Sequence, residues 1–197
     1  MVTGIFGGSF DPIHVGHAML ANMLSQWHGL DRVWLMPSRL NPLKIDSRKP
    51  APDADRIAMC RLVAERCANV EVCDIEMQLP LPSYTYTTLT TLRDLYPDEK
   101  FRLIIGSDNW QIFGQWRQSE KIIREFGVVI YVRPGYPVTE ELPSGVTLIE
   151  NMPQVQVSST LIRELIRKGE NVNFLVPSEV IDYIQDNELY HGDERDK

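Results

Sequence analysis

The chain has 197 residues, of which 43% are hydrophobic and 24% charged, and its formal net charge is −7 at pH 7. This composition is typical of a globular protein with one well-packed core, and the acidic balance argues against a nucleic-acid binder held by a broad basic face. We find no apolar run near the roughly 20 residues that cross a membrane, and no secretory signal at the N-terminus. We therefore expect a cytoplasmic protein that binds neither nucleic acid nor a membrane.

Strand and helix patterns alternate through the first half of the chain. Short apolar runs predict strands, and apolar residues at helical spacing predict helices. In chain order we expect a strand at 2–6, a helix at 15–27, a strand at 32–37, a polar loop at 41–53, a helix at 54–67 and a strand at 69–77. Asp53 is expected to cap the second helix.

The second half continues this alternation. Residues 84–97 are rich in threonine and tyrosine, which favours a strand, but Leu89, Leu92 and Leu95 recur at helical spacing, so we predict a helix. The remaining expected elements are a strand at 101–106, a helix at 119–126, strands at 127–132 and 146–150, and helices at 158–170 and 177–189.

Several of these strands are apolar on both faces, which predicts a parallel sheet covered by helices on both sides. The expected fold class is therefore α/β, a Rossmann-like doubly wound sheet, with residues 1–190 as a single domain and residues 191–197 as a polar tail. Ligands of such sheets bind beyond the carboxyl ends of the strands. Cys60, Cys67 and Cys73 form no CxxC pair, so we expect reduced packing residues rather than a metal or redox site.

The end of the first strand carries the stretch GGSFDPIHVGH, residues 7–17. Gly7 and Gly8 permit positive φ and let a ligand approach the backbone. The next helix offers unpaired N–H groups, and His14 and His17, three residues apart, share a face of its first turn. The pattern favours a phosphate site over the alternative, a turn whose histidines only cap or pack.

This stretch resembles the (H/T)xGH motif of the nucleotidyltransferase superfamily. Near the other end of the chain, SSTLIR at residues 158–163 resembles the second phosphate-binding motif of that superfamily, ISSTxIR, with Val157 in place of the isoleucine. The two motifs lie about 140 residues apart, and each begins a predicted helix.

Three further segments resemble the bacterial nicotinate-mononucleotide adenylyltransferases within that superfamily. PSRLNPLK resembles their NPHK loop and has Lys44 at the cationic position. GSDNWQIFGQW resembles their GxD segment followed by a tryptophan, which places Asp108 and Trp116. PSYTYTTL resembles their SYTxDT segment, which places Tyr84 and Thr85.

The resemblance extends from Val2 to about Leu189 and departs from the family pattern at two places. Leu43 stands where histidine is common, and residues 86–87 lack the usual aspartate.

The resemblance implies adenylyl transfer from ATP to nicotinate mononucleotide, giving nicotinate adenine dinucleotide and pyrophosphate. The catalytic residues that it implies are His14, His17, Lys44 and Arg163. The ATP-binding residues that it implies are Gly7, Gly8, Ser9, Phe10, His14, His17, Gly106, Asp108, Ser158, Ser159 and Arg163. The residues that it implies for nicotinate mononucleotide are Lys44, Tyr84, Thr85 and Trp116.

The chemistry of this reaction limits the role of the histidines. The attacking phosphate monoester has a second pKa near 6 and is mostly dianionic at neutral pH, so it needs no general base. We therefore interpret His17 as a donor to the triphosphate and its transition state. We expect in-line attack without a covalent intermediate, Mg²⁺ that enters with ATP, and no metal site built from protein ligands.

Two other functions remain as alternatives. A phosphopantetheine adenylyltransferase would share the fold and the two main motifs, and a non-catalytic nucleotide-binding module would keep the fold without turnover. In all cases the expected partners are small molecules, and a homo-oligomer is compatible with the sequence.

Overall fold

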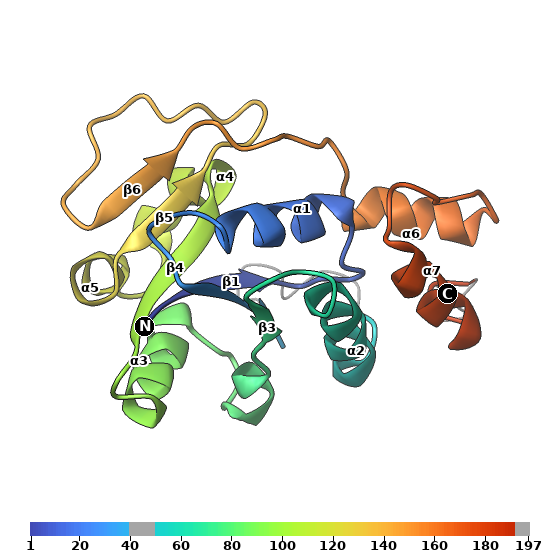
Figure 1. Ribbon diagram of the computed structural model, residues 1–197, viewed down its shortest axis with the longest axis horizontal. Coiled ribbons are helices and arrows are strands. Elements are labelled where there is room, and N and C mark those ends of the chain that lie inside the picture. The colour runs from blue at the N-terminus through green and yellow to red at the C-terminus, as the bar shows by residue number, and fades with distance from the viewer. Residues whose placement is uncertain (40–49, 192–197) are drawn as a thin grey trace.

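The computed structural model describes residues 1–39 and 50–191, so the predicted site residue Lys44, like Leu43, lies outside the described residues. A six-stranded sheet forms the centre of the molecule (Figure 1). Its strands lie in the order β3-β2-β1-β4-β5-β6. Each neighbouring pair is parallel. The strands are β1 (Val2–Gly8), β2 (Arg32–Pro37), β3 (Val70–Val72), β4 (Lys100–Gly106), β5 (Val128–Tyr131) and β6 (Val146–Ile149).

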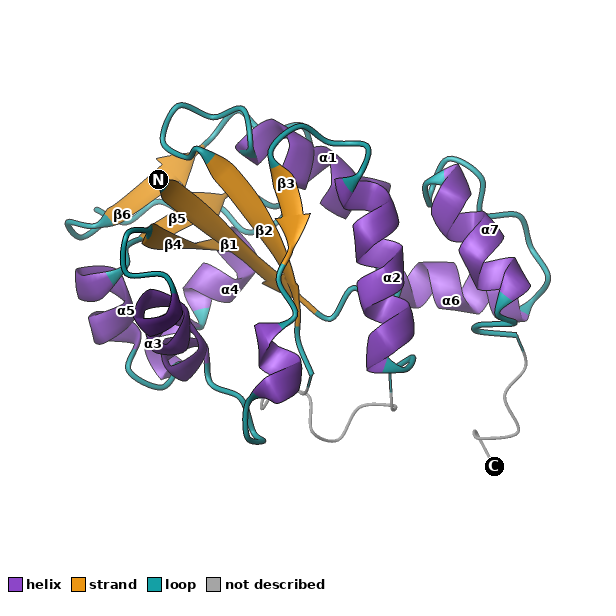
Figure 2. Ribbon diagram, turned by 60° about the horizontal axis from the view of Figure 1, so that its bottom comes forward, coloured by secondary structure: helices purple, strands orange, loops and turns teal. Residues whose placement is uncertain are grey.

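Helices cover both faces of this sheet, which confirms the predicted doubly wound α/β fold (Figure 2). One face packs against α1 (Val15–Leu24) and α2 (Asp53–Ala64), and that core continues into α6 (Ser159–Arg167) and α7 (Ser178–Asp186). The other face packs against α3 (Thr85–Leu95), α5 (Ser119–Glu125) and the short η3 (Phe113–Gln115). The remaining short helices are η2 (Ile75–Gln78) and α4 (Ser107–Gln111).

Alternation along the strands supplies the two cores. Phe6 and Ile104 belong to the core beside α1 and α2, whereas their neighbours Ile5 and Leu103 belong to the core beside α3 and α5. Successive side chains of a strand point to opposite faces, so continuously apolar strands such as β1 and β4 can fill both cores. The three cysteines are free and pack in or against these cores, as predicted.

Two local predictions are wrong. The third strand ends at Val72, and residues 75–78 form η2 instead of continuing the strand. Its partner β2 ends at Pro37, which has no N–H to extend the ladder, and the last backbone bond of this pair is donated by Cys73 N to Leu35 O, at 2.9 Å. Asp53 does not cap α2: Pro52 is the N-cap, and Asp53 is the first helical residue.

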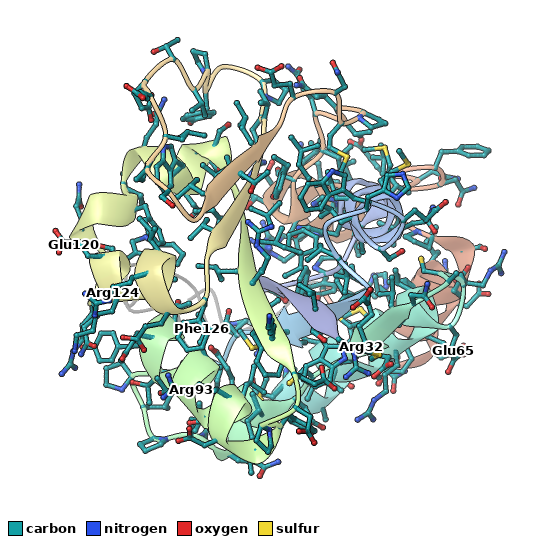
Figure 3. All side chains as sticks on the ribbon, turned by 60° about the vertical axis from the view of Figure 1, so that its left-hand side comes forward. Arg32, Glu65, Arg93, Glu120, Arg124 and Phe126 are labelled. Carbon is teal, nitrogen blue, oxygen red and sulfur yellow. The ribbon has the colours of Figure 1, made fainter. Side chains whose placement is uncertain are left out.

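Side chains of α3 tie it to the end of α5 (Figure 3). Arg93 donates to Glu125 at 3.2 Å, and its guanidinium lies 5.6 Å from the centroid of the Phe126 ring. Tyr86 lies in the segment that lacks the usual aspartate of the family pattern, and its hydroxyl donates a hydrogen bond to Glu125 at 3.1 Å. Tyr86 therefore helps to fix α3 against α5.

In the part of the chain that the structure describes, no helix is long and apolar enough to span a membrane.

Candidate active site

The sheet reverses its order between β1 and β4, because the chain builds β2 and β3 on one side of β1 and places β4, β5 and β6 on the other. Ligands of open parallel sheets bind at such a switch point, beyond the carboxyl ends of the strands. Here those ends are Gly8 of β1 and Gly106 of β4. Both predicted motifs at these ends therefore lie where a ligand is expected.

Two cavities open at this edge of the sheet and adjoin one another. The first has a volume of about 570 Å³ and includes His14, Ser158, Ser159 and Arg163 in its lining. The second has a volume of about 590 Å³ and includes Gly7, Gly8, Tyr84, Thr85, Gly106, Asp108 and Trp116 in its lining. The residues that line both are Ser9, His17, Ser38, Tyr131 and Arg133. Two ligands bound side by side would meet at these shared residues.

The first turn does not use the positive φ that its glycines permit. Gly7 and Gly8 are the last residues of β1 and do not have positive φ; the left-handed residue is Phe10, with φ of 45°. A Cβ on Gly8 would lie 3.0 Å from the Phe10 ring, so the glycine leaves room for this close packing. Phe10 is fully buried and its side chain lines neither cavity, so the ring packs in the core, and its role in ATP binding stays a prediction.

The two histidines lie against each other at the start of α1. Their rings are stacked with centroids 3.7 Å apart, and the Phe10 ring meets His17 edge-on at 5.0 Å. The backbone N–H of His14 donates to Nδ1 of His17 at 3.3 Å. Because Nδ1 of His17 accepts this bond, the proton of the neutral ring is assigned to Nε2. His17 therefore holds an N–H donor without needing a positive charge.

Both histidines favour the neutral form. Burial, with a smaller effect of the Arg133 guanidinium, lowers the pKa of His14 to about 4. Burial, followed by His14 and Arg133, lowers the pKa of His17 well below its usual value. A bound polyphosphate would oppose these effects, because nearby negative charge favours the protonated ring.

The low pKa of His14 predicts a pH-dependent stability. The unfolded state takes up a proton near the ordinary pKa of 6.5, whereas the folded state resists until about pH 4. The free energy of unfolding therefore falls as the pH drops through this window, by about 2 kcal/mol from His14 between about pH 7.5 and pH 5. We expect His14→Gln to remove that part of the fall, as measured by urea unfolding at several pH values. His28→Gln, which changes an exposed histidine, is the matched control; an unaltered pH dependence in His14→Gln would contradict the prediction.

Arg133 is a site residue that the sequence did not single out. It follows β5, its Nη1 donates to Oδ2 of Asp108 at 2.9 Å, and its backbone N–H donates to Oγ of Ser107 at 2.8 Å. A Cβ on Gly106 would collide with Asp108 and with the Arg133 side chain, so the glycine makes room for this pair. Its position just after a strand at the carboxyl edge is the signal that could have indicated it.

Three buried polar side-chain atoms within the described ranges have no hydrogen-bond partner: Nδ1 of His14, Oδ1 of Asp108 and Nε1 of Trp116. Unpaired buried polar atoms are costly in a folded protein. All three belong to residues that line the two cavities. They provide both donors and acceptors for a polar ligand.

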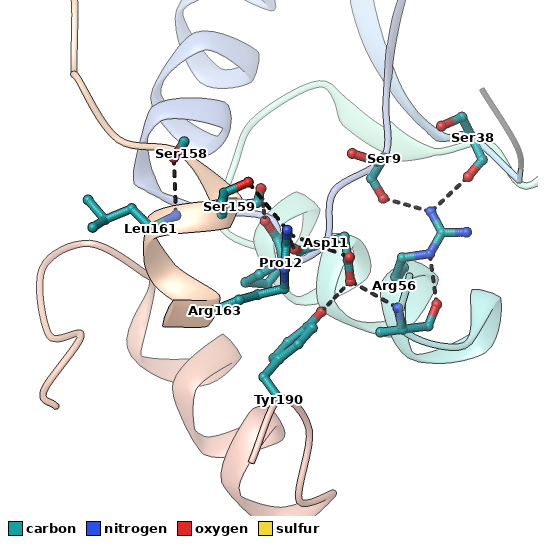
Figure 4. Close-up of polar contacts among 12 residues, drawn as sticks. Ser9, Asp11, Pro12, Ser38, Arg56, Ser158, Ser159, Leu161, Arg163 and Tyr190 are labelled. Atoms are coloured by element: carbon teal, nitrogen blue, oxygen red, sulfur yellow. Dashed lines mark hydrogen bonds and ion pairs between the residues drawn. The ribbon is translucent and has the colours of Figure 1, made fainter. Parts of the chain in front are cut away.

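The C-terminal motif contacts the histidine turn directly (Figure 4). Oγ of Ser158 caps α6 by accepting from Leu161 N at 3.2 Å, and Oγ of Ser159 donates to Pro12 O at 2.9 Å. Arg163 donates to the backbone oxygen of Asp11 at 2.6 Å and lies 3.6 Å from its carboxylate. The two motifs, far apart in the sequence, are therefore brought together.

The Asp11 carboxylate joins several parts of the chain at this point (Figure 4). Its Oδ1 accepts from the Ala51 backbone at 3.0 Å and from the Tyr190 hydroxyl at 2.9 Å. Neither Asp11 nor Tyr190 was predicted, because their contact spans 179 positions and no local pattern indicates it.

Arg56 of α2 fixes the ends of two neighbouring strands. It is fully buried, and its Nη1 donates to Ser9 O at 2.6 Å and to Ser38 O at 2.8 Å (Figure 4). Since Ser9 and Ser38 line both cavities, Arg56 positions the shared boundary between them.

The fold and the paired histidines at its switch point define the class of protein: a nucleotide-binding α/β protein of the nucleotidyltransferase type. A family model described as cytidylyltransferase-like matches residues 5–165. A probable nicotinate-nucleotide adenylyltransferase of Bacteroides thetaiotaomicron is 44% identical over 185 residues, 93% of this chain and 91% of that protein. One of Porphyromonas gingivalis is 38% identical over 178 residues, 90% of each chain. The chain therefore belongs to the cytidylyltransferase-like family and, within it, to the nicotinate-nucleotide adenylyltransferases.

A solved structure has the same fold. The nicotinic acid mononucleotide adenylyltransferase of Plasmodium falciparum, complexed with NaAD, superposes with a TM-score of 0.79 at 23% identity, over 96% of this chain and 97% of that one. The resemblance inferred from the sequence motifs is thereby confirmed at the level of family and fold.

Proposed function

We propose that this protein transfers the adenylyl group of ATP to nicotinate mononucleotide. A phosphate oxygen of the mononucleotide attacks the α-phosphorus of ATP; the new P–O bond forms as the bond to the β-phosphate breaks, and pyrophosphate leaves with the bonding electrons. The observation that supports this best is the pair of adjoining cavities, which meet at His17 and Arg133. Two phosphorylated ligands placed there would bring their phosphates together.

The triphosphate is assigned to the first cavity. His14 and His17 offer ring donors, Arg163 offers a cation, and the hydroxyls of Ser9, Ser158 and Ser159 lie around the same space. Such groups stabilise the charge that develops during phosphoryl transfer, and they are positioned before the reaction begins. Lys44 is retained as a further cation for both substrates on the basis of its sequence motif.

The adenosine is assigned to the boundary near Gly106 and Asp108. Oδ1 of Asp108 is a buried acceptor without a partner, which suits a ribose hydroxyl. Both residues line the second cavity beside Arg133, which itself lines both cavities, so the adenosine site borders the acceptor site.

The nicotinate mononucleotide is assigned to the second cavity. Tyr84 is the N-cap of α3, so the first N–H groups of this 11-residue helix lie beside the cavity and suit a carboxylate. Trp116 lines the same space and offers a ring for stacking on the pyridine.

Mg²⁺ would enter on the triphosphate and neutralise part of its charge. Of the described residues that line the first cavity, Asp11 is the one carboxylate, and its oxygens already contact Ala51, Tyr190 and Arg163. This donor set does not suit a protein cage for the metal, but it leaves a metal bound to ATP unhindered.

The test is a pyrophosphate-release assay with ATP, Mg²⁺ and one acceptor at a time. We expect rapid release with nicotinate mononucleotide, slower release with nicotinamide mononucleotide, none with phosphopantetheine, and none after chelation of the metal. Pyrophosphate release with phosphopantetheine, and with neither mononucleotide, would identify the protein as a phosphopantetheine adenylyltransferase. Binding of ATP without release for any acceptor would show a binding module and contradict the proposed activity.

A further inference from the structure

Arg117 has no assigned role in the sequence motifs, yet it lines the second cavity next to Trp116. The other arginine in that lining, Arg133, is paired with Asp108. No carboxylate in residues 1–39 or 50–191 forms an ion pair with Arg117. The cavity therefore contains a positive charge that no carboxylate of the described residues neutralises.

The position of this charge is fixed by an aromatic contact. The Arg117 guanidinium lies over the Tyr84 ring, 4.7 Å from its centroid, as in cation–π pairs. Tyr84 is also the N-cap of α3. A side-chain cation and the positive end of a helix dipole thus converge beside Trp116.

The described carboxylates of the same cavity do not neutralise the positive charge of Arg117. Glu76 accepts hydroxyl hydrogen bonds from Ser83 at 3.2 Å and from Thr88 at 3.0 Å, and burial raises its pKa. Asp108 is held by Arg133. An anionic group beside Trp116 would therefore interact with Arg117, the unpaired arginine in the described lining of this cavity.

We propose that Arg117 is a specificity-determining residue, whose guanidinium at the pyridine end of the second cavity favours an acceptor bearing a carboxylate over the corresponding carboxamide. This inference rests on the proposed function, and it attributes the selectivity between the two mononucleotides to the side chain of Arg117. A carboxylate gains a charge–charge interaction there, whereas a neutral amide does not. Since Arg117 is exposed, solvent limits the gain, and a single pair of charges near 4 Å in water gives about 1 kcal/mol, or roughly fivefold.

The test compares three variants by kcat/KM for nicotinate and nicotinamide mononucleotide at saturating ATP and Mg²⁺. We expect Arg117→Gln to lower the value for the acid about fivefold, mainly through KM, and to leave the value for the amide within about twofold. Arg117→Lys should restore most of the acid preference because it keeps the charge. Arg124→Gln removes an exposed arginine of α5 that pairs with Glu125 and lines neither cavity, and it should change neither value.

Calorimetric binding of the two mononucleotides provides a second readout that does not need turnover. In Arg117→Gln we expect weaker binding of nicotinate mononucleotide and unchanged binding of nicotinamide mononucleotide. An equal loss for acid and amide would overturn the inference and show that Arg117 only supports the Tyr84 ring. An unchanged acid-to-amide ratio in an active enzyme would also overturn it while leaving the proposed function intact, whereas a wild-type protein that neither binds nor adenylylates either mononucleotide overturns both.

Discussion

Replacing His17 with alanine is expected to lower kcat/KM for adenylyl transfer by about 100- to 1000-fold while the protein stays folded. His17 lines both cavities, at the place where the α-phosphate and the attacking phosphate would meet. Loss of one preorganised donor to transition-state charge has an effect of this size in other enzymes. The loss should fall mainly on kcat, because the donor matters most when charge develops.

The pH dependence of this loss distinguishes a donor from a general base. The His14 N–H occupies Nδ1 of His17, so the neutral ring already has its proton on Nε2. The protonated ring keeps this N–H, so the ratio of wild-type to His17→Ala kcat/KM should persist as the pH is lowered from 7 toward the depressed pKa of the ring. A general base would instead give a difference that disappears as the pH falls and the ring is protonated.

His28→Ala is the control for the loss of a histidine, because His28 is exposed in the turn after α1. Circular dichroism and thermal unfolding report whether His17→Ala is folded. If this variant unfolds, the role of His17 is to pack between His14 and Phe10 rather than to contact phosphate.

The sequence predicted the sheet well because its strands are bounded by strong local signals. Pro37 ends β2 at the predicted residue, and Gly106 ends β4. The third strand was overextended because residues 73–77 alternate apolar and charged side chains as a strand does, whereas the missing N–H of Pro37 ends the pairing. The end of β3 therefore depends on the neighbouring strand β2 and cannot be predicted from the sequence of residues 73–77 alone.

The site was predictable to the extent that its residues belong to motifs. His14, His17, Asp108 and Arg163 all line the predicted edge, because the carboxyl ends of parallel strands meet there. The conformation of the turn was not predictable, since the left-handed residue is Phe10 rather than a glycine. Arg133 was missed because its partner Asp108 lies 25 positions away. Arg56 was missed because the strand-end carbonyls that it bonds, those of Ser9 and Ser38, lie 47 and 18 positions away.

Replacing Arg56 with methionine is expected to lower the free energy of unfolding by about 3–5 kcal/mol. The Arg56 side chain is fully buried and donates to the backbone oxygens of Ser9, Ser38 and Ala51, and its remaining nitrogen pairs with Asp53. Methionine has a similar length but no donor. The three carbonyls would lose their partner together, and an unpaired buried acceptor is costly.

Arg61→Met on the same helix is the matched control. Its side chain is 59% exposed and makes one ion pair, with Asp74 at 3.3 Å, so the expected loss is below about 1 kcal/mol. Urea unfolding of both variants measures the difference, provided that the slope of the transition is unchanged.

Arg56→Lys isolates what the forked guanidinium contributes beyond its charge. A lysine can reach one of the strand-end carbonyls but cannot join Ser9 O to Ser38 O in the way that a single guanidinium nitrogen does here. We expect Arg56→Lys to lose less stability than Arg56→Met. At temperatures where the variant is folded, its kcat/KM should still be about tenfold lower than that of the wild type, because a displacement of about 1 Å at a phosphate-transfer site slows the reaction strongly. Wild-type kcat/KM in Arg56→Lys would mean that the boundary of the two cavities is fixed by the strands alone, and a loss below about 1 kcal/mol in Arg56→Met would contradict the stabilising role of the buried arginine.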